Sequence, residues 1–195
     1  MNFLGHLFLS GKNEDIIVGN FIADAVKGNS FNKYPDGIAK GIRLHREIDH
    51  FTDHHPVFLS SRSRLYPRYR MYAGVIVDIY YDHYLAKNWQ DFSEEKLQYV
   101  VSKAYFLLIR RIHLLPPGSK RILPFMITQN WLVNYKDLNS LQRVFNGMDR
   151  RTGHRSGMGG AIEDLLIHYQ EYESEFKEFF REIINHIQTF RSNLD

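Results

Sequence analysis

The C-terminal part of the chain repeats its apolar residues at steps of three and four. Between about residues 160 and 190, these residues are Ile162, Leu165, Leu166, Tyr169, Phe176, Phe179, Phe180, Ile183, Ile184 and Ile187. This spacing places apolar side chains along one side of an α-helix, because about 3.6 residues complete a turn. The pattern therefore predicts one long helix that buries its apolar stripe against the rest of the chain.

The remaining sequence also carries helix signals. Asn13 and Ser93 suit helix N-caps, Gly28 follows a predicted helix end, and Pro56 and Pro116 close two further segments. The predicted helices cover about residues 13–27, 35–55, 70–87, 94–115, 131–132 and 160–190. Strand signals are weak, because no Asn-Gly turn joins two alternating apolar runs, and Asn146-Gly147, the one such dipeptide, is expected to end a helical pattern. We therefore expect an all-α fold, a multi-helix bundle.

Length and composition limit the class of protein. The chain has 195 residues, 44% of them hydrophobic, which suits one globular domain over residues 1–195. It has no cysteine, which excludes disulfides, Cys-ligated metal sites and a thiol nucleophile. The apolar runs are too short for a membrane span. The apolar segment 1–9 lacks the basic start and cleavage site of a signal peptide, so a cytoplasmic protein is expected.

One predicted helix carries a line of metal-ligand residues. His45, Asp49 and Asp53 are spaced four residues apart. At about 100° per residue, three such positions drift only about 80° around the helix axis. All three side chains are therefore expected on one face.

Other carboxylates and imidazoles lie in apolar company. Asp78, Asp82 and His83 fall within a run of Val, Ile and Tyr residues, Asp24 follows Phe21-Ile22-Ala23, and His6 lies between apolar neighbours. Burying a carboxylate there costs several kcal/mol unless a cation or a hydrogen bond compensates. The simplest explanation is that these groups converge on one polar cavity that holds a divalent metal. Taken singly, an i,i+4 pair can be a surface contact, and a buried Asp can pair with an Arg or a backbone amide.

The residue types also suggest which metal would bind. A sulfur-free, oxygen-rich ligand set favours Mn²⁺, Mg²⁺ or Fe²⁺ over structural Zn²⁺. The other histidines are interpreted as structural. His50, His54 and His55 could form a second face but are expected to be solvated near a helix end, and no carboxylate stands at a suggestive spacing from His113, His154, His168 or His186.

Arginines are candidates for binding anions. Arg43 and Arg46 flank His45 and could grip a phosphate, or could pair with Glu47 or Asp49 on the same helix. The Gly- and Arg-rich segment 150–160 could wrap an anionic group, although a flexible linker is favoured because the segment lacks the P-loop pattern. Two basic stretches indicate an anionic partner or simply a solvated surface. They contain Arg62, Arg64, Arg68, Arg70, Arg150, Arg151 and Arg155.

Five blocks of sequence resemble the acyl carrier protein phosphodiesterases, also called acyl carrier protein hydrolases. They are MNFLGHLFLS at 1–10, GNFIADAVKG at 19–28, LHREIDHFTD at 44–53, VDIYYDHYLAKNW at 77–89 and QNWLVNYKDLNSLQRVFNGM at 129–148. The blocks span about three-quarters of the chain, in order. That family is similar to the HD-type metal-dependent phosphohydrolases, although no His is followed by Asp in this chain.

The resemblance implies an activity and a set of site residues. The expected reaction is hydrolytic removal of 4′-phosphopantetheine from the serine of holo acyl carrier protein, with Mn²⁺ as the cofactor. The matching positions are His6, Asn20, Asp24, His45, Asp49, Asp53, Asp78, Asp82 and His83.

We assign expected roles to these positions. Asp24, His45, Asp49 and Asp82 are predicted metal ligands, and a metal-activated water would attack the phosphorus. His6, Asp78 and His83 are expected catalytic helpers, since a serine alkoxide leaves more easily when it is protonated. Asn20, Arg43, Arg46 and Asp53 are expected to bind substrate, and the two basic stretches to dock the acidic carrier protein.

Two alternatives to this reading remain open. One is an HD-like hydrolase of a free nucleotide such as a guanosine polyphosphate. The other is a non-catalytic module that binds an acidic protein. Neither a membrane nor a nucleic acid is expected as a partner.

Overall fold

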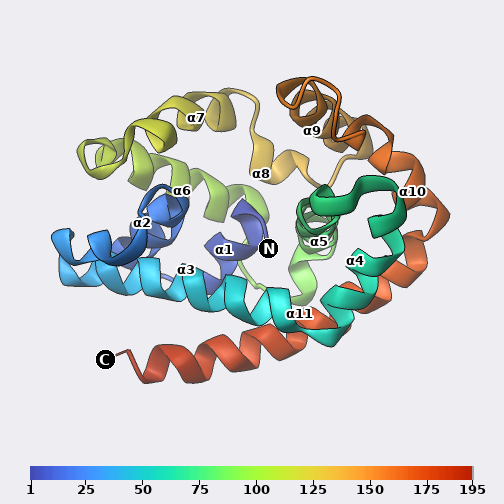
Figure 1. Ribbon diagram of the computed structural model, residues 1–195. Helices are drawn as coiled ribbons and strands as arrows, with labels where there is room; N and C mark the ends of the chain where they lie inside the picture. Colours follow the sequence, from blue (N-terminus) through green and yellow to red (C-terminus); the bar gives the residue numbers. More distant parts are fainter. Residues whose placement is uncertain (195) are drawn as a thin grey trace.

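The protein, described here from a computed structural model over residues 1–194, consists of α-helices and short 3₁₀ segments (Figure 1). Over this part of the chain there is no strand, which confirms the all-α prediction. No helix in these residues is both long enough and apolar enough to cross a membrane. The helices are α1 (Phe3–Ser10), α2 (Glu14–Ile22), α3 (Asp36–His54), α4 (Pro56–Tyr69), α5 (Ala73–Lys87), α6 (Leu97–Arg110), α7 (Pro117–Thr128), α8 (Trp131–Asn134), α9 (Leu138–Arg151), α10 (Ala161–Ile167) and α11 (Tyr169–Ser192).

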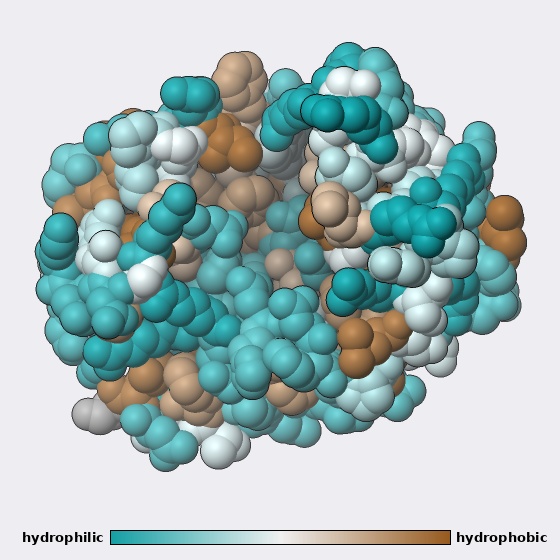
Figure 2. Space-filling view, in the orientation of Figure 1, coloured by the Kyte–Doolittle hydropathy of each residue, from teal (hydrophilic) through white to brown (hydrophobic). Residues whose placement is uncertain are grey.

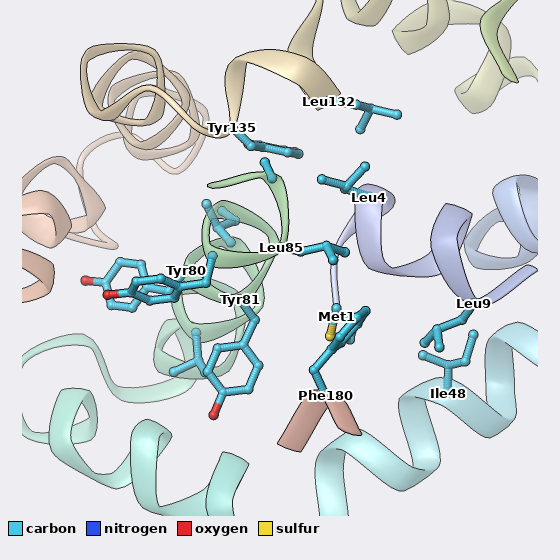
Figure 3. Close-up of a cluster of buried hydrophobic side chains, with 14 of the residues drawn as sticks. Met1, Leu4, Leu9, Ile48, Tyr80, Tyr81, Leu85, Leu132, Tyr135 and Phe180 are labelled. Carbon is cyan, nitrogen blue, oxygen red and sulfur yellow. The ribbon is translucent and has the colours of Figure 1, made fainter. Parts of the chain in front are cut away.

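Helix α5 forms the centre of the core. Its residues from Ile79 to Leu85 are all buried, including three tyrosines, as expected of a helix that is surrounded by others. Figure 3 shows Leu85 of α5 lying near Leu4 of α1, while Tyr80 and Tyr81 lie on other sides of α5. Helices α1, α4 and α11 all contact α5. The carboxylates of α5 are therefore held inside the packed interior or at its edge.

The C-terminal apolar stripe forms two helices instead of one. Helix α10 ends at Ile167, His168 leaves the helical conformation with φ −118° and ψ 32°, and α11 begins at Tyr169. The predicted single helix over 160–190 is therefore wrong at this point. The break lets the Tyr169 hydroxyl reach Nε2 of His83 at 2.7 Å, and the Tyr84 hydroxyl donates to the Tyr169 carbonyl at 2.6 Å. These long-range contacts are not encoded in the local spacing.

Several other helix ends differ from prediction. Asn13 caps α2 as expected, accepting from the amides of Asp15 and Ile16, but α2 ends at Ile22 and a 3₁₀ turn follows. Ser93 caps no helix, because its hydroxyl accepts from Glu95 N within a turn and α6 begins only at Leu97. The helical pattern before Asn146-Gly147 belongs to α9, which the Asp137 side chain caps by accepting from Ser140 N. Asn146-Gly147 lies inside α9 and does not end it.

Helices α2 and α3 cross at two glycines. A Cβ added to Gly41 would lie 2.4 Å from the Ile16 carbonyl oxygen and 2.9 Å from the Cα of Gly19. A Cβ on Gly19 would lie 2.1 Å from the Ile38 carbonyl oxygen. Only glycine permits two helix backbones to approach this closely. Helix α2 carries Asn20, and α3 carries His45 and Asp49, so this crossing sets the distance between the polar groups of the two helices.

Helix α1 begins on the carboxylate of Asp82. This side chain is fully buried, and its two oxygens accept from Leu4 N at 2.8 Å and from Gly5 N at 3.0 Å. A negative charge there satisfies unpaired amides at the helix start and is favoured by the helix dipole. Asp82 therefore anchors α1, and with it His6, against α5.

We predict that the glycine crossing limits stability. Gly41→Ala should lower the free energy of unfolding by at least about 2 kcal/mol, because the new methyl meets backbone that cannot rotate away. Gly147→Ala is the matched control inside α9, where an added Cβ meets nothing within 4 Å. It should leave stability unchanged or raise it by up to about 1 kcal/mol. Urea unfolding followed by circular dichroism measures both, and equal effects would contradict the crossing argument.

We also predict a pH dependence from Asp82. Burial raises its pKa to about 7, while the bonds from Leu4 N and Gly5 N act in the opposite direction. The folded pKa lies above the unfolded value of about 4, so folding takes up a proton between these pH values. The stability that this group contributes is therefore lost as pH rises from about 4 to about 7.

Comparison with Asp82→Asn isolates this contribution. The free energy of unfolding of the parent protein minus that of Asp82→Asn should fall by a few kcal/mol between about pH 4 and pH 8. Urea titrations at several pH values measure this difference. A constant difference over that range would show that Asp82 does not cause the pH dependence.

Candidate functional site

A cavity of about 1010 Å³ opens between the N-terminal helices and the α6–α9 segment. The face drawn in Figure 2 is hollowed near its middle, with brown apolar atoms above the hollow and teal polar atoms around it. One wall comes from α1, α2, α3 and α5 and carries His6, Asn20, His45, Asp49 and other polar groups. The opposite wall comes from α6, α7 and α8 and is mainly apolar, with Leu108, Met126 and Trp131 among its residues.

Two imidazoles and one carboxylate meet on the polar wall. Nε2 of His6 lies 3.1 Å from Oδ1 of Asp49, and Nε2 of His45 lies 3.1 Å from Oδ2 of the same carboxylate. The two imidazole rings stack with centroids 4.1 Å apart. His6, His45 and Asp49 each offer one ligand atom within 4.8 Å of the others, so the group can hold a metal ion. The helical face predicted for His45 and Asp49 is thus completed by a histidine from α1.

Asn20 orients both histidines from behind. Its Oδ1 lies 2.9 Å from Nδ1 of His6 and 2.9 Å from Nδ1 of His45. The amide cannot be reversed, because its Nδ2 donates to the His6 carbonyl at 3.2 Å and to Ser10 Oγ at 2.8 Å. An amide oxygen only accepts, so both Nδ1 atoms carry the proton. Both Nε2 atoms therefore face the cavity, in the arrangement typical of metal-binding histidines.

The two histidines differ in protonation near pH 7. Burial lowers the pKa of His6 to about 4, so its Nε2 presents a lone pair to the Asp49 oxygen near pH 7. Burial opposes the charge on His45 too, but hydrogen bonds to Asp24 and Asp49 raise its pKa to about 9. Asp49 is partly buried, but its histidine partners hold its pKa below the usual range.

The distances between the imidazole nitrogens and the Asp49 oxygens fit a metal site. Two acceptors that face each other at 3.1 Å repel unless a proton or a metal ion lies between them. Ligand atoms of an octahedral cation held at about 2.1 Å are about 3.0 Å apart. The residues present therefore fit a divalent cation.

Three further carboxylates lie around this group. Oδ1 of Asp24 is 3.1 Å from Nε2 of His45, and Asp24 is largely exposed. Asp53 lies one turn beyond Asp49 and also lines the cavity. Asp78 lines it as well, and its Oδ1 accepts from the α-amino group of Met1 at 2.7 Å. Burial raises the pKa of Asp78, against the opposing effect of that ammonium group.

Four residues expected to bind metal, assist catalysis or bind substrate lie outside the cavity lining. Asp82 is committed to the amides of α1 and is absent from the His6–His45–Asp49 group. His83 lies between the Tyr135 carbonyl, 2.8 Å from Nδ1, and the Tyr169 hydroxyl. Arg46 donates to the carbonyls of Val26 and Gly28, and both Arg43 and Arg46 lie over the ring of Phe31 at 5.1 Å. These contacts position α1, α3, α5 and the turn after α2.

The two basic stretches differ in how far their charge is neutralised. Arg64 donates to both oxygens of Glu175, and Arg68 donates to Asp164 at 2.8 Å. Arg62 and Arg70 belong to the same stretch, and Arg70 lies over the Tyr66 ring. Arg150 and Arg151 instead line the cavity, together with Arg143. Arg155 donates to the Thr152 carbonyl and does not line the cavity.

Sequence reasoning missed several features of the site. Arg143 was not singled out, although it precedes Arg150 by seven residues, which is two helical turns. Some histidines interpreted as structural have carboxylate partners, because His55, which is buried and not solvated, His154 and His186 lie within 3.1 Å of Glu182, Asp149 and Glu47 respectively. Two of these pairs join residues more than one hundred positions apart, so no local spacing could reveal them.

Comparison with known proteins places the chain in a family. The acyl carrier protein phosphodiesterase family profile matches residues 1–183. An acyl carrier protein phosphodiesterase from Photorhabdus laumondii is 33% identical over 181 residues, covering 92% of this chain and 91% of the relative. Proteins of the same name from Enterobacter sp. and Escherichia coli O139:H28 are each 32% identical over 92% of this chain and 94% of the relative.

No solved structure matches the chain, so the likeness to HD-type phosphohydrolases stays a prediction. The family match, by contrast, extends over all the residues that form the cavity, from α1 to α9. The chain belongs to the acyl carrier protein phosphodiesterase family.

Proposed function

We propose that this protein hydrolyses the phosphodiester that links 4′-phosphopantetheine to the serine of acyl carrier protein, releasing apo carrier protein. The observation that carries the proposal is the His6–His45–Asp49 group on the wall of a large cavity, in a chain of this family. The cavity offers space for an extended arm, and its apolar wall offers that arm a surface that excludes water.

The residues of the polar wall have different proposed roles. Nε2 of His6, Nε2 of His45 and the carboxylate of Asp49 would hold a divalent cation, with Mn²⁺ favoured and Mg²⁺ or Fe²⁺ as alternatives. Such a cation, when bound, polarises phosphodiester oxygens and lowers the pKa of water. Asn20 keeps both imidazoles in the tautomer that can bind a cation. Asp24, beside His45, would extend the ligand set.

A proton must reach the serine oxygen as it leaves. Asp78 lines the cavity, and burial raises its pKa, so this carboxyl holds a proton more readily than an exposed one. Asp53 lies on the same wall and is available to hydrogen-bond the substrate. We assign these two carboxylates to the substrate side of the site.

We predict that cation binding depends on this group. In calorimetric titrations with MnCl₂, the unaltered protein should bind Mn²⁺, and Asp49→Ala should not. Asn20→Ala should weaken binding by about 10–100-fold, because the histidines lose their common acceptor. Asp91→Asn, an exposed carboxylate outside the cavity lining, is the control and should bind like the parent protein. Equal binding by Asp49→Ala and the parent would contradict the ligand assignment.

We predict the corresponding loss of activity. Holo acyl carrier protein incubated with the enzyme and Mn²⁺ should lose the mass of phosphopantetheine in mass spectra, and excess EDTA should prevent this. Asp49→Ala should abolish the release while its circular dichroism spectrum keeps the parental helix content. Retained activity would refute the role of Asp49.

A parallel incubation with guanosine tetraphosphate tests the nucleotide alternative. Turnover of the nucleotide without any change in the carrier would favour a free-nucleotide hydrolase. Tight binding of carrier protein without any mass change would favour a binding module. Either result would replace the proposed function.

A further inference from the structure

One face of α9 lines the cavity with three arginines. Arg143 and Arg150 are seven residues apart and so lie on the same side of the helix, with Arg151 beside them. All three are exposed. The ion pairs of residues 1–194 involve other cations, such as Arg64, Arg68, Arg110 and Arg111. None of the three α9 guanidinium groups therefore lies within 4.0 Å of a described carboxylate. We call Arg143, Arg150 and Arg151 the α9 arginine face.

The other arginine-rich surface, around α4, is partly neutralised. Arg64 is paired with Glu175 at 2.7 Å, and Arg68 with Asp164 at 2.8 Å and Glu163 at 3.6 Å. Those acidic residues belong to α10 and α11, so they tie α4 to the C-terminal helices. An incoming anion would have to compete with these carboxylates. The α9 arginine face has no such internal competitor among the described residues.

The cavity therefore has walls of opposite charge. Asp24, Asp49, Asp53 and Asp78 lie on the wall built by α3, α5 and the 3₁₀ turn after α2, and the α9 arginine face lies on the other side. From Arg143 to Arg150 the helix rises about 10 Å, at about 1.5 Å per residue. One phosphate group is too small to contact all of that length. A stripe of this size suits several carboxylates displayed on the surface of a protein.

We propose that the α9 arginine face docks an acidic surface of the carrier protein next to its modified serine. This inference rests on the proposed function, which supplies the partner, and adds where that partner binds and by what chemistry. With the carrier body held at α9, the phosphodiester can enter the cavity toward His6, His45 and Asp49. The apolar wall from α6, α7 and α8 then lies beside the arm. Docking thus fixes the direction from which the substrate enters.

Charge reversal on α9 tests the proposal. For Arg150→Glu/Arg151→Glu, the KM for holo carrier protein should rise at least about tenfold, while kcat at saturation stays within about twofold, since the docking charges lie outside the reacting group. Raising the salt concentration should raise the KM of the parent enzyme and change that of the variant much less, because salt screens exposed charges.

The matched control is Lys120→Glu/Arg121→Glu. These two adjacent basic residues lie exposed on α7, do not line the cavity, and give the same change in net charge. The control should keep the parental KM. An equal rise in KM for both double variants would show an effect of net charge alone and would overturn the α9 assignment. If the double variant does not fold, Arg143→Glu is the second test. With a parental melting temperature it should raise the KM for holo carrier protein, and a parental KM would overturn the α9 assignment.

A second substrate separates docking from phosphate binding. The probe is a short, uncharged synthetic peptide with phosphopantetheine on its serine, which has no acidic surface. Its KM should be the same for the parent and for Arg150→Glu/Arg151→Glu. A parallel rise in KM for the peptide would mean that the arginines bind the phosphate, which overturns docking.

Failure of the proposed function gives a different result. The parent enzyme would then release phosphopantetheine from neither the carrier nor the peptide. Binding of fluorescent apo carrier protein would still report on docking. A Kd at least about tenfold weaker for the double variant than for the parent would support the α9 face, and equal Kd values would overturn it.

Discussion

The close crossing of α2 and α3 at Gly19 and Gly41 is the constraint on which the site depends. The two backbones approach to a distance that leaves no room for a single methyl group. This contact brings Asn20 and Asp24 from one segment to His45 and Asp49 from the other. A larger spacing would remove the hydrogen bonds that align the imidazoles. The polar site is therefore a consequence of backbone packing as much as of its own side chains.

Asn20 fixes the orientation of the two histidines at this crossing. A single amide oxygen accepts from two buried histidines, and the amide nitrogen is itself held by Ser10 and by the His6 carbonyl. Both Nε2 atoms are left directed to the Asp49 carboxylate, His6 with a lone pair and His45 with a proton that hydrogen bonds to Asp24 and Asp49 stabilise. Buried polar groups need partners, and each ring nitrogen of His6 and His45 has a polar neighbour. A cation would offset the repulsion between Nε2 of His6 and the Asp49 carboxylate.

The rest of the fold forms a cavity around His6, His45 and Asp49, and the walls of this cavity differ in polarity and charge. Helix α5 and the start of α1 support the polar wall, because buried Asp82 accepts from the amides of Leu4 and Gly5. Helices α6 to α9 supply an apolar surface and a row of exposed arginines. The proposed substrate has a phosphodiester, an extended arm and an acidic carrier, one for each of these surfaces. The proposed function therefore rests on both the cavity and the family membership.

The sequence by itself determined the helical character, the Asn13 cap and the common face of His45 and Asp49, because these follow from contacts within a few residues. It did not determine which groups meet. His6 and Asp49 are 43 positions apart, and Asp82, a predicted ligand, turned out to hold the start of α1. Whether a carboxylate or a guanidinium is free depends on what packs against it. Only the tertiary structure decides this, because burial and pairing join segments that are distant in the chain.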